Sequence, residues 1–405
     1  MHASAAVAKP GSADPNAIDP NATGPIERIG RIADVIAAAG GKNEALGRLA
    51  PEVVDKLHEQ KLFRMLLPRV CGGEEVDLVT WFRAMEALAK LDASTAWCVG
   101  QMNGCAAMAS AVAPAVAQKI WGEPRAALSW GPPMQARADE VDGGYRLSGE
   151  WMMSSGSRHA TWLGLTAPLF DKRGNAALLP EGVTTRIFFV PADAVEWVDS
   201  WQVIGLNATN SGGFKVADRF VPHGFVVSRE HLPEVRLQTP LYRFPLNSLF
   251  ATGFSAVALG ISRAMLDACI ALAIEKKPRL AKVSLLDNHL VQLQIGEAEA
   301  RLRSARSYVE TTVQRVWQSV VASEQLTIPQ RMDIRMAATF AIHEAKAVAD
   351  VAWEVAGANA IFNSGPFERR LRDIRTVTQQ LQGRKSHLQE VGAYLLGAEP
   401  NLVLA

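Results

Sequence analysis

The sequence predicts an α+β protein, mostly α-helical, with an N-terminal helical domain, a central β domain and a C-terminal bundle of long helices. Two observations predict this order. Apolar residues recur at helical spacing in the first and last parts of the chain, and they alternate with polar residues in the middle. The 405 residues suit two or three average domains or one large composite unit. We expect a tail over residues 1–24 and domains over residues 25–125, 126–232 and 233–405.

Successive amphipathic helices are expected in the first domain. Apolar residues at helical spacing form one face of the first helix: Ile26, Ile29, Ala33 and Ile36. This helix is expected to end at Gly40-Gly41, and Pro51 opens the next helix at a favoured first-turn position. A third apolar stripe covers residues 81–89, and Ser94 is expected to cap a fourth helix.

Period-two patterns mark the strands of the central domain. Tyr145, Leu147 and Gly149 alternate with polar residues after an Asp-Gly-Gly turn, and further strands are expected over residues 185–190 and 214–221. No helical pattern separates these segments. We therefore expect a compact β domain and not a parallel sheet.

A long apolar stripe characterises the last domain. Seven residues keep the helical period over many turns: Leu290, Leu293, Ala298, Leu302, Ala305, Val309 and Val316. Helices of this length pack side by side in bundles, so we expect a bundle over the C-terminal part of the chain.

The composition excludes several classes of function. Hydrophobic residues make up 48% and charged residues 20% of the chain, which is typical of a globular protein with a large core. The 42 basic and 41 acidic residues leave a formal charge of +1, so no attraction to nucleic acid or to an anionic membrane is expected. The four cysteines and eight histidines show no ligand spacing, and we expect no metal site.

The apolar runs and the N-terminal residues predict a cytoplasmic protein. The most apolar run, residues 250–261, is interrupted by two glycines and is too short to cross a membrane. The first residues lack a basic start followed by an apolar stretch, so they do not form a signal peptide. Their composition predicts a disordered tail.

Common cofactor and nucleophile motifs are absent. No G-x-G-x-x-G follows a predicted strand, and neither a P-loop nor a G-x-S-x-G motif occurs. A Rossmann-type dinucleotide site, a phosphate-binding loop and an α/β-hydrolase nucleophile are therefore not expected.

One segment of the central domain combines residues that suit a planar ligand. It runs from Trp151 to Trp162 and reads WMMSSGSRHATW. Small hydroxyl residues beside a glycine let backbone N–H groups approach a ring closely, and the two tryptophans could flank that ring. The alternative is a strand end with a Ser-Gly turn and two core tryptophans. The spacing alone favours this alternative.

Four stretches together resemble the acyl-CoA dehydrogenase superfamily. They are STAWCVGQMNG from Ser94, GYRLSGEWMMSSGSRHATW from Gly144, GLNATNSGGFKVADRFVP from Gly205 and GPFERRLRDIRTVTQQ from Gly365. They follow the order and distances of the family. The chain is most similar to the oxygenase components of two-component flavin-dependent monooxygenases, such as p-hydroxyphenylacetate and dibenzothiophene monooxygenases. The resemblance implies the acyl-CoA dehydrogenase-like fold and a homotetramer with each flavin between subunits.

The resemblance also implies a set of flavin-binding residues: Trp151, Ser154, Ser155, Gly156, Thr209, Ser211, Arg279 and Arg372. By this resemblance Ser154 or Ser155 donates a hydrogen bond near flavin N5, and Arg279 reaches the phosphate or adenine end of a neighbouring subunit's flavin. Arg372 and Asp373 start the last functional segment. Two alternatives remain: Arg279 as a solvated charge, and Arg372-Asp373 as an ordinary ion pair.

The residues after Arg372-Asp373 bear on the reaction. Acyl-CoA dehydrogenases often carry a glutamate in this region that abstracts a proton, whereas this chain has Gln379 and Gln380. An amide cannot act as a general base. Many of the similar monooxygenases have one histidine near the position of Gln380 and another where this chain has residues 103–105, and both are replaced here. The candidate catalytic residues are Ser155, Gln379, Gln380 and His159, with His387 as a further histidine.

The resemblance and these departures favour a flavin-dependent monooxygenase component. It would use reduced FMN or FAD from a separate NAD(P)H:flavin reductase and O₂ to oxygenate a small aromatic or heteroatom-containing substrate through a C4a-hydroperoxyflavin. An apolar pocket is expected to include Trp97, Met102 and Phe250. The alternatives are an acyl-CoA dehydrogenase or flavin oxidase with a displaced base, and a non-catalytic binding protein that keeps the fold.

Overall fold

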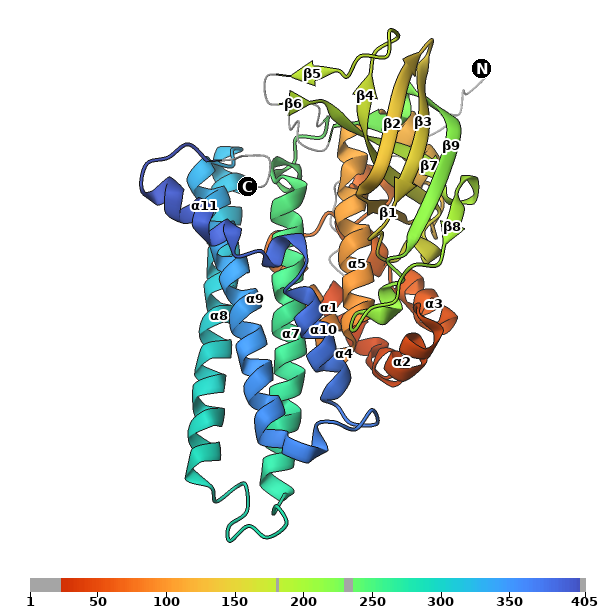
Figure 1. Ribbon diagram of the computed structural model, residues 1–405. Helices are drawn as coiled ribbons and strands as arrows, with labels where there is room; N and C mark the ends of the chain where they lie inside the picture. Colours follow the sequence, from red (N-terminus) through yellow and green to blue (C-terminus); the bar gives the residue numbers. More distant parts are fainter. Residues whose placement is uncertain (1–22, 180–181, 229–235, 401–405) are drawn as a thin grey trace, which may run out of the picture.

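The structure is a computed structural model that describes residues 23–179, 182–228 and 236–400. Within these ranges a group of helices precedes a central sheet, and a group of longer helices follows it (Figure 1). This order confirms the predicted α+β fold class. The tail predicted over residues 1–24 lies, apart from its last two residues, outside the described residues.

The helices before the sheet form the N-terminal layer. They are α1 (Pro25–Arg31), α2 (Ala33–Leu46), α3 (Pro51–Glu59), α4 (Leu78–Leu91), α5 (Ala93–Ala106) and α6 (Pro114–Trp121). Pro51 stands at the first position of α3, as predicted. The prediction that a helix ends at Gly40-Gly41 is wrong, because α2 continues to Leu46. A Cβ atom at Gly40 would lie 2.2 Å from a terminal nitrogen of Arg369, so this glycine admits a neighbouring side chain within the helix.

Helix α5 is buried along its whole length. It packs against α4, α7 (Leu246–Glu275) and strand β1 (Leu128–Gly131), so the helix contacts protein on several sides. Its N-cap is Asp92 and not the predicted Ser94: the Asp92 carboxylate accepts a hydrogen bond from the Thr95 N–H at 2.8 Å. This central position brings α5 side chains to the junction of the helices and the sheet.

The central sheet has the strand order β10-β7-β4-β2-β3-β9-β8, with β1 paired to β4. The strands after β1 are β2 (Pro133–Val141), β3 (Gly144–Trp151), β4 (Trp162–Phe170), β7 (Thr185–Pro191), β8 (Glu196–Val198), β9 (Gly213–Pro222) and β10 (Val226–Val227). A separate pair is formed by β5 (Leu178–Leu179) and β6 (Gly182–Val183). Most neighbours are antiparallel, but β4 runs parallel to β1 and β2. The predicted β domain is therefore present with two parallel pairings that its sequence pattern does not reveal.

Long helices form the C-terminal layer. Helices α7, α8 (His289–Ser323) and α9 (Ile328–Ala356) lie side by side (Figure 1). The shorter α10 (Glu368–Val377) and α11 (Ser386–Leu395) pack against this bundle. The predicted stripe of α8 is buried from Ala298 onward, but Leu290 and Leu293 are 62% and 58% exposed. The first turns of α8 thus have an apolar face that the described residues do not cover.

Helix α7 contains the apolar run of residues 250–261 and extends beyond it at both ends. It passes through both glycines of the run, and a Cβ atom at Gly260 would lie 2.4 Å from the Glu86 carbonyl oxygen of α4. This glycine therefore permits two helices to approach closely. By length and composition alone, α7 is the one described helix that could cross a membrane, and 56% of its most apolar window is buried inside the protein. Burial of this kind is also found in the core helices of proteins that do not enter membranes.

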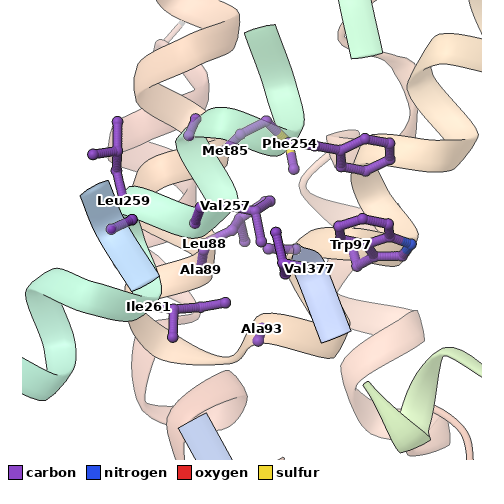
Figure 2. Packing of buried hydrophobic residues seen from close by; sticks show 14 of the residues in the cluster. Met85, Leu88, Ala89, Ala93, Trp97, Phe254, Val257, Leu259, Ile261 and Val377 are labelled. Carbon is purple, nitrogen blue, oxygen red and sulfur yellow. The ribbon is translucent and has the colours of Figure 1, made fainter. Parts of the chain in front are cut away.

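The main core extends over helices before and after the sheet, and α4, α5, α7 and α10 meet in one part of it. Figure 2 shows Met85, Leu88, Val257 and Val377 from these helices in one packed cluster. At its edge the rings of Trp97 and Phe254 stack, with centroids 3.9 Å apart and an interplanar angle of 12°. These two rings also face a cavity, so the core and the candidate site share a wall.

Candidate active site

A cavity of about 440 Å³ opens where the central sheet meets helices from the N-terminal and C-terminal parts of the chain. Its aromatic lining is contributed by separate segments: Trp97, Trp130, Trp201, Phe250 and Phe254. Hydroxyl and amide side chains complete the wall: Gln101, Ser155, Thr209, Ser211, Thr376, Gln379, Gln380 and Gln382. A mostly apolar cavity of this size with a few convergent polar groups is typical of a small-molecule site.

Four of the lining side chains form one chain of hydrogen bonds. The indole N–H of Trp97 donates to Ser155 Oγ at 3.0 Å, and Ser155 Oγ lies 2.6 Å from Ser211 Oγ. Ser211 Oγ lies 2.7 Å from Thr209 Oγ1, and the Thr209 hydroxyl donates to the Leu206 carbonyl oxygen at 2.8 Å. The ends determine the direction, because an indole N–H can only donate and a carbonyl can only accept. Each hydroxyl therefore donates toward Leu206.

This direction changes the role expected for Ser155. Its proton is used in the bond to Ser211, so Ser155 offers a lone pair to a ligand and not a proton. Ser154 is fully buried outside the cavity, where its hydroxyl pairs with Ser129 Oγ at 3.1 Å. In this arrangement neither serine has a free hydroxyl proton, and the expected donation from one of them to a ligand stays a prediction.

The hydroxyl chain should contribute measurably to stability. We expect Thr209→Val to lower the free energy of unfolding by about 1 kcal/mol, because the buried Ser211 hydroxyl loses its acceptor. Thr209→Ser keeps the hydroxyl and should change the free energy by about 0.5 kcal/mol or less, which makes it the matched control. Urea unfolding of the two variants measures the difference. Equal stability of Thr209→Val and Thr209→Ser would contradict the assigned bond.

A turn after α10 carries the amide side chains of the cavity. The Gln380 side-chain oxygen accepts from the Gln382 backbone N–H at 2.8 Å, which orients the amide. Its Nε2 is buried and has no hydrogen-bond partner among the described residues. Burying an amide N–H without a partner is unfavourable, so this position is suited to a ligand that accepts a hydrogen bond. Gln379 differs, since its Nε2 donates to Thr378 Oγ1 at 3.1 Å and its side chain is exposed.

Three backbone carbonyls of this turn accept hydrogen bonds from side chains that do not line the cavity. The turn includes the 3₁₀ segment Leu381–Gly383. The carbonyl of Leu381 accepts from His387 Nε2 at 2.7 Å, and that of Gly383 accepts from His343 Nε2 at 2.9 Å. The Gln382 carbonyl lies 3.4 Å from the Thr339 hydroxyl, which makes a longer contact. Two histidines and a threonine thus position the backbone that carries Gln380.

The tautomer of His387 follows from its neighbours. The buried Arg335 guanidinium, which can only donate, contacts His387 Nδ1, so this nitrogen accepts. The ring proton is then on Nε2, where it binds the Leu381 carbonyl. Burial and the positive charge of Arg335 lower the pKa of His387, and burial lowers the pKa of Arg335 to about 10. His387 therefore positions the turn as a neutral ring and does not line the cavity.

The structure brings part of the predicted site together. Ser155, Thr209, Ser211, Gln379 and Gln380 all line the cavity, although they lie on three distant segments of the sequence. Trp97 and Phe250 of the predicted apolar pocket do so as well, whereas Met102 packs behind Gly156. The cavity therefore contains both the Ser-Gly segment and the glutamines that were interpreted separately.

Other predicted residues lie elsewhere. Trp151 is buried in the sheet core, stacked near Phe214, and its N–H donates to the Thr166 carbonyl at 2.8 Å. Trp162 stacks on Phe225, so neither tryptophan lines the cavity. His159 is also outside the lining, and burial lowers its pKa to about 4. The alternative of core tryptophans describes Trp151 correctly, whereas Trp162 is half-buried at the edge of a core cluster.

The two predicted arginines do not reach the cavity of their own chain. Arg372 forms ion pairs with Glu368 and Glu44, so the alternative of an Arg372-Asp373 ion pair does not hold. Asp373 is buried and accepts the Leu206 N–H at 2.6 Å. Arg279 is exposed beyond the far end of α7, about 30 Å along the helix from Phe254 at a rise of about 1.5 Å per residue. Arg279 is therefore not part of the cavity of its own chain.

Several lining residues were not predicted from the sequence. Gln101 lies four residues after Trp97 on α5, where helical spacing places both on one face, and its amide donates to the Trp130 carbonyl at 3.2 Å. That spacing is a signal that could have identified it. Asn103 lies in the segment of residues 103–105, where the resemblance implied a histidine in similar enzymes; its side chain binds the Leu62 carbonyl at 2.7 Å and the Leu66 N–H at 3.0 Å. Asn103 therefore has a structural role.

Comparison with known proteins identifies the family. The acyl-CoA dehydrogenase N-terminal domain matches residues 32–120, and the C-terminal domain of the same family matches residues 252–382. A pigment production hydroxylase of Rhodococcus erythropolis is 30% identical over 359 residues, which cover 86% of this chain and 90% of that protein. The indole-3-acetate monooxygenase of Pseudomonas putida is 27% identical, covering 89% and 90%. Among solved structures, XiaF from Streptomyces in complex with FADH₂ has a TM-score of 0.86 at 24% identity, covering 93% of this chain and 96% of that one.

Helices, a central sheet and a helical bundle in this order form an acyl-CoA dehydrogenase-like fold. The chain belongs to the acyl-CoA dehydrogenase family. Its curated relatives are flavin-dependent monooxygenases and hydroxylases. These findings confirm the predicted family, the predicted fold and the predicted class of enzyme.

Proposed function

We propose that this chain is the oxygenase component of a two-component flavin-dependent monooxygenase that acts on small aromatic substrates in the cytoplasm. It receives reduced FMN or FAD from a separate NAD(P)H:flavin reductase and uses O₂. The observation that carries this proposal is the cavity itself, which combines aromatic walls with hydroxyls and amides. None of the described residues that line it is a carboxylate, so the wall offers no base for the proton abstraction of a dehydrogenase.

The cavity residues fit a flavin ring. Trp97, Phe254 and the other aromatic side chains supply flat apolar surfaces, and the unpartnered Gln380 Nε2 supplies a donor. Ser155 supplies a lone pair, which suits an N–H of the reduced ring better than an unprotonated nitrogen of the oxidised ring. Bound reduced flavin supplies the electrons with which O₂ is activated.

The protein's own contribution is orientation and the exclusion of water. The stacked pair Trp97–Phe254 closes one wall, and the His387 and His343 contacts hold the opposite turn in place. Gln380 then presents a donor at a defined position, where it can bind an oxygen atom. The described lining contains no histidine, so a substrate must react through its own electron-rich ring or heteroatom.

Exposed groups at the far end of the bundle support a homotetramer. Arg279 cannot reach its own cavity, and Leu280, Ile361 and Phe362 are 96%, 62% and 59% exposed. Apolar side chains exposed together are typical of subunit contacts. A second copy packed there would cover them and bring Arg279 to a neighbouring flavin.

The test is oxygen-dependent turnover of aromatic compounds with reduced flavin supplied by a reductase. We expect incorporation of one atom of ¹⁸O₂ into product, and tighter binding of reduced than of oxidised flavin. Gln380→Leu should lower the product formed per O₂ consumed about tenfold, because loss of one positioned donor commonly costs a factor of this size or more. Gln389→Leu, on the exposed side of α11, is the matched control. Bleaching of a tightly bound oxidised flavin by an acyl-CoA would contradict the proposal.

A further inference from the structure

One cation lies in the cavity wall without a counter-charge among the described residues. Of the described residues that line the cavity, Arg384 alone has an ionisable side chain. It follows directly after the 3₁₀ segment that carries Gln382, so it belongs to the same turn as Gln380. Its side chain is exposed, which places it at the opening of the cavity, and the structure shows no hydrogen bond or ion pair to its guanidinium within the described part of the chain.

The backbone beneath this arginine is well anchored. The Arg384 N–H donates to the Leu381 carbonyl at 3.2 Å, and the Arg384 carbonyl accepts from the His387 N–H at 3.1 Å. The neighbouring Leu381 and Gly383 carbonyls are held by His387 and His343. The guanidinium is therefore attached to a fixed point at the cavity, and its five donors are available to a ligand.

We propose that Arg384 binds a carboxylate of the substrate, so that the preferred substrates of this enzyme are aromatic acids. This inference rests on the proposed function. A guanidinium binds a carboxylate through two parallel hydrogen bonds, and an apolar wall beside it strengthens the attraction. The aromatic walls accept the ring of such a substrate, while the opening accepts its charged end. The short reach of one arginine side chain favours a carboxylate attached to the ring by a short linker.

The flavin phosphate is the other anion that could meet Arg384. A flavin phosphate is separated from its ring by a five-carbon chain, whereas Arg384 shares a short turn with the glutamine that faces the cavity. This proximity favours the substrate as the source of the anion. The two sources predict different effects of the same substitution, which the experiment below separates.

The test pairs an acid with a neutral ligand of the same shape. Indole-3-acetate and indole-3-acetamide, and p-hydroxyphenylacetate and its amide, are titrated into the full chain loaded with reduced flavin under anaerobic conditions. Quenching of tryptophan fluorescence reports binding, since Trp97, Trp130 and Trp201 line the cavity. We expect wild type to bind at least one acid about tenfold more tightly than its amide, the factor typical of a charged hydrogen bond.

Variants decide whether Arg384 causes this preference. Arg384→Gln should bring the acid-to-amide affinity ratio close to one and leave amide binding unchanged. Lys385→Gln, which removes the adjacent exposed charge outside the lining, should keep the ratio. A ratio near one in wild type for both pairs, or a ratio preserved in Arg384→Gln, overturns the inference. Weaker flavin binding in Arg384→Gln with an unchanged ratio also overturns it, because it assigns the anion to the flavin.

Turnover separates this inference from the proposed function. If the amides and the acids are oxygenated equally well and Arg384→Gln has no effect, the monooxygenase stands and the carboxylate site fails. If the ratio behaves as expected but none of these ligands, and no other aromatic compound, is oxygenated, the binding site stands and the proposed reaction fails.

Discussion

Replacement of Asp373 by alanine is expected to lower the free energy of unfolding by about 2 kcal/mol at pH 6, because it leaves a buried N–H without an acceptor. The Asp373 carboxyl is buried and accepts the Leu206 N–H at 2.6 Å. The Leu206 carbonyl in turn accepts from Thr209 and, at 3.2 Å, from the Trp201 indole. Loss of Asp373 should therefore also disorder two lining residues and lower the affinity for reduced flavin. Urea unfolding and flavin titration measure both effects.

The isosteric variant Asp373→Asn separates charge from hydrogen bonding. Burial is the largest influence on Asp373; together with the nearby Asp92 it raises the pKa of this carboxyl to about 7, against the lowering effect of the Leu206 N–H. The folded state therefore holds a proton that the unfolded chain releases near its ordinary pKa of 3.8. This group makes the protein less stable as the pH rises from about 4 through about 7, by up to about 1.4 kcal/mol per pH unit.

Asparagine keeps the acceptor for Leu206 and cannot ionise. Asp373→Asn should match wild type near pH 5 and exceed its stability at pH 8, while Asp373→Ala should be less stable than Asp373→Asn at both values. Parallel pH profiles of wild type and Asp373→Asn would show that this carboxyl does not titrate in the folded protein with a raised pKa.

Replacement of His387 by alanine is expected to lower the free energy of unfolding by about 3 kcal/mol. The substitution removes the acceptor that partners the buried Arg335 guanidinium and the donor that holds the Leu381 carbonyl. The turn that carries Gln380 then loses one of its anchors. We expect less product per O₂ consumed, with a larger fall in kcat than rise in KM, as befits a positioning residue. His289→Ala, at an exposed position at the start of α8, is the control.

The His387 assignment also predicts a response to acid. Burial and Arg335 hold the pKa of His387 below its ordinary value of 6.5, so the unfolded chain binds a proton more readily than the folded protein does. Stability from this group is present above about pH 6.5 and is lost as the pH falls below it. His387→Gln, which has a donor and an acceptor but does not titrate, should lose less stability between pH 7 and pH 5.5 than wild type. A steeper loss in the variant would contradict this.

Local patterns predicted some elements well and others poorly, for identifiable reasons. Pro51 opens a helix as expected because its effect is local to one turn. Gly40 does not end a helix: α2 continues past it, and the missing side chain leaves room for Arg369. Trp151 and Trp162 have the chemistry to contact a ring, but neither lines the cavity. Trp151 is buried within the sheet core, and Trp162 stacks on Phe225. Residue type indicates which contacts a side chain can make, and tertiary packing determines which groups it meets.

By itself the sequence determined the order of helices, strands and long helices, the family, and the segments that supply the site. These depend on the periodicity of nearby residues and on motifs within single stretches. Only the tertiary structure decided that Trp97, Ser155, Ser211 and Thr209 share one directed chain of hydrogen bonds, and that Gln380, a lining residue, has a buried Nε2 without a partner among the described residues. It also decided that Arg384 lies there without a carboxylate partner in the part of the chain that the structure describes. The physical reason is that the direction of a hydrogen bond and the pairing of a charge depend on which groups lie close together in space. Here these groups come from segments far apart in the chain.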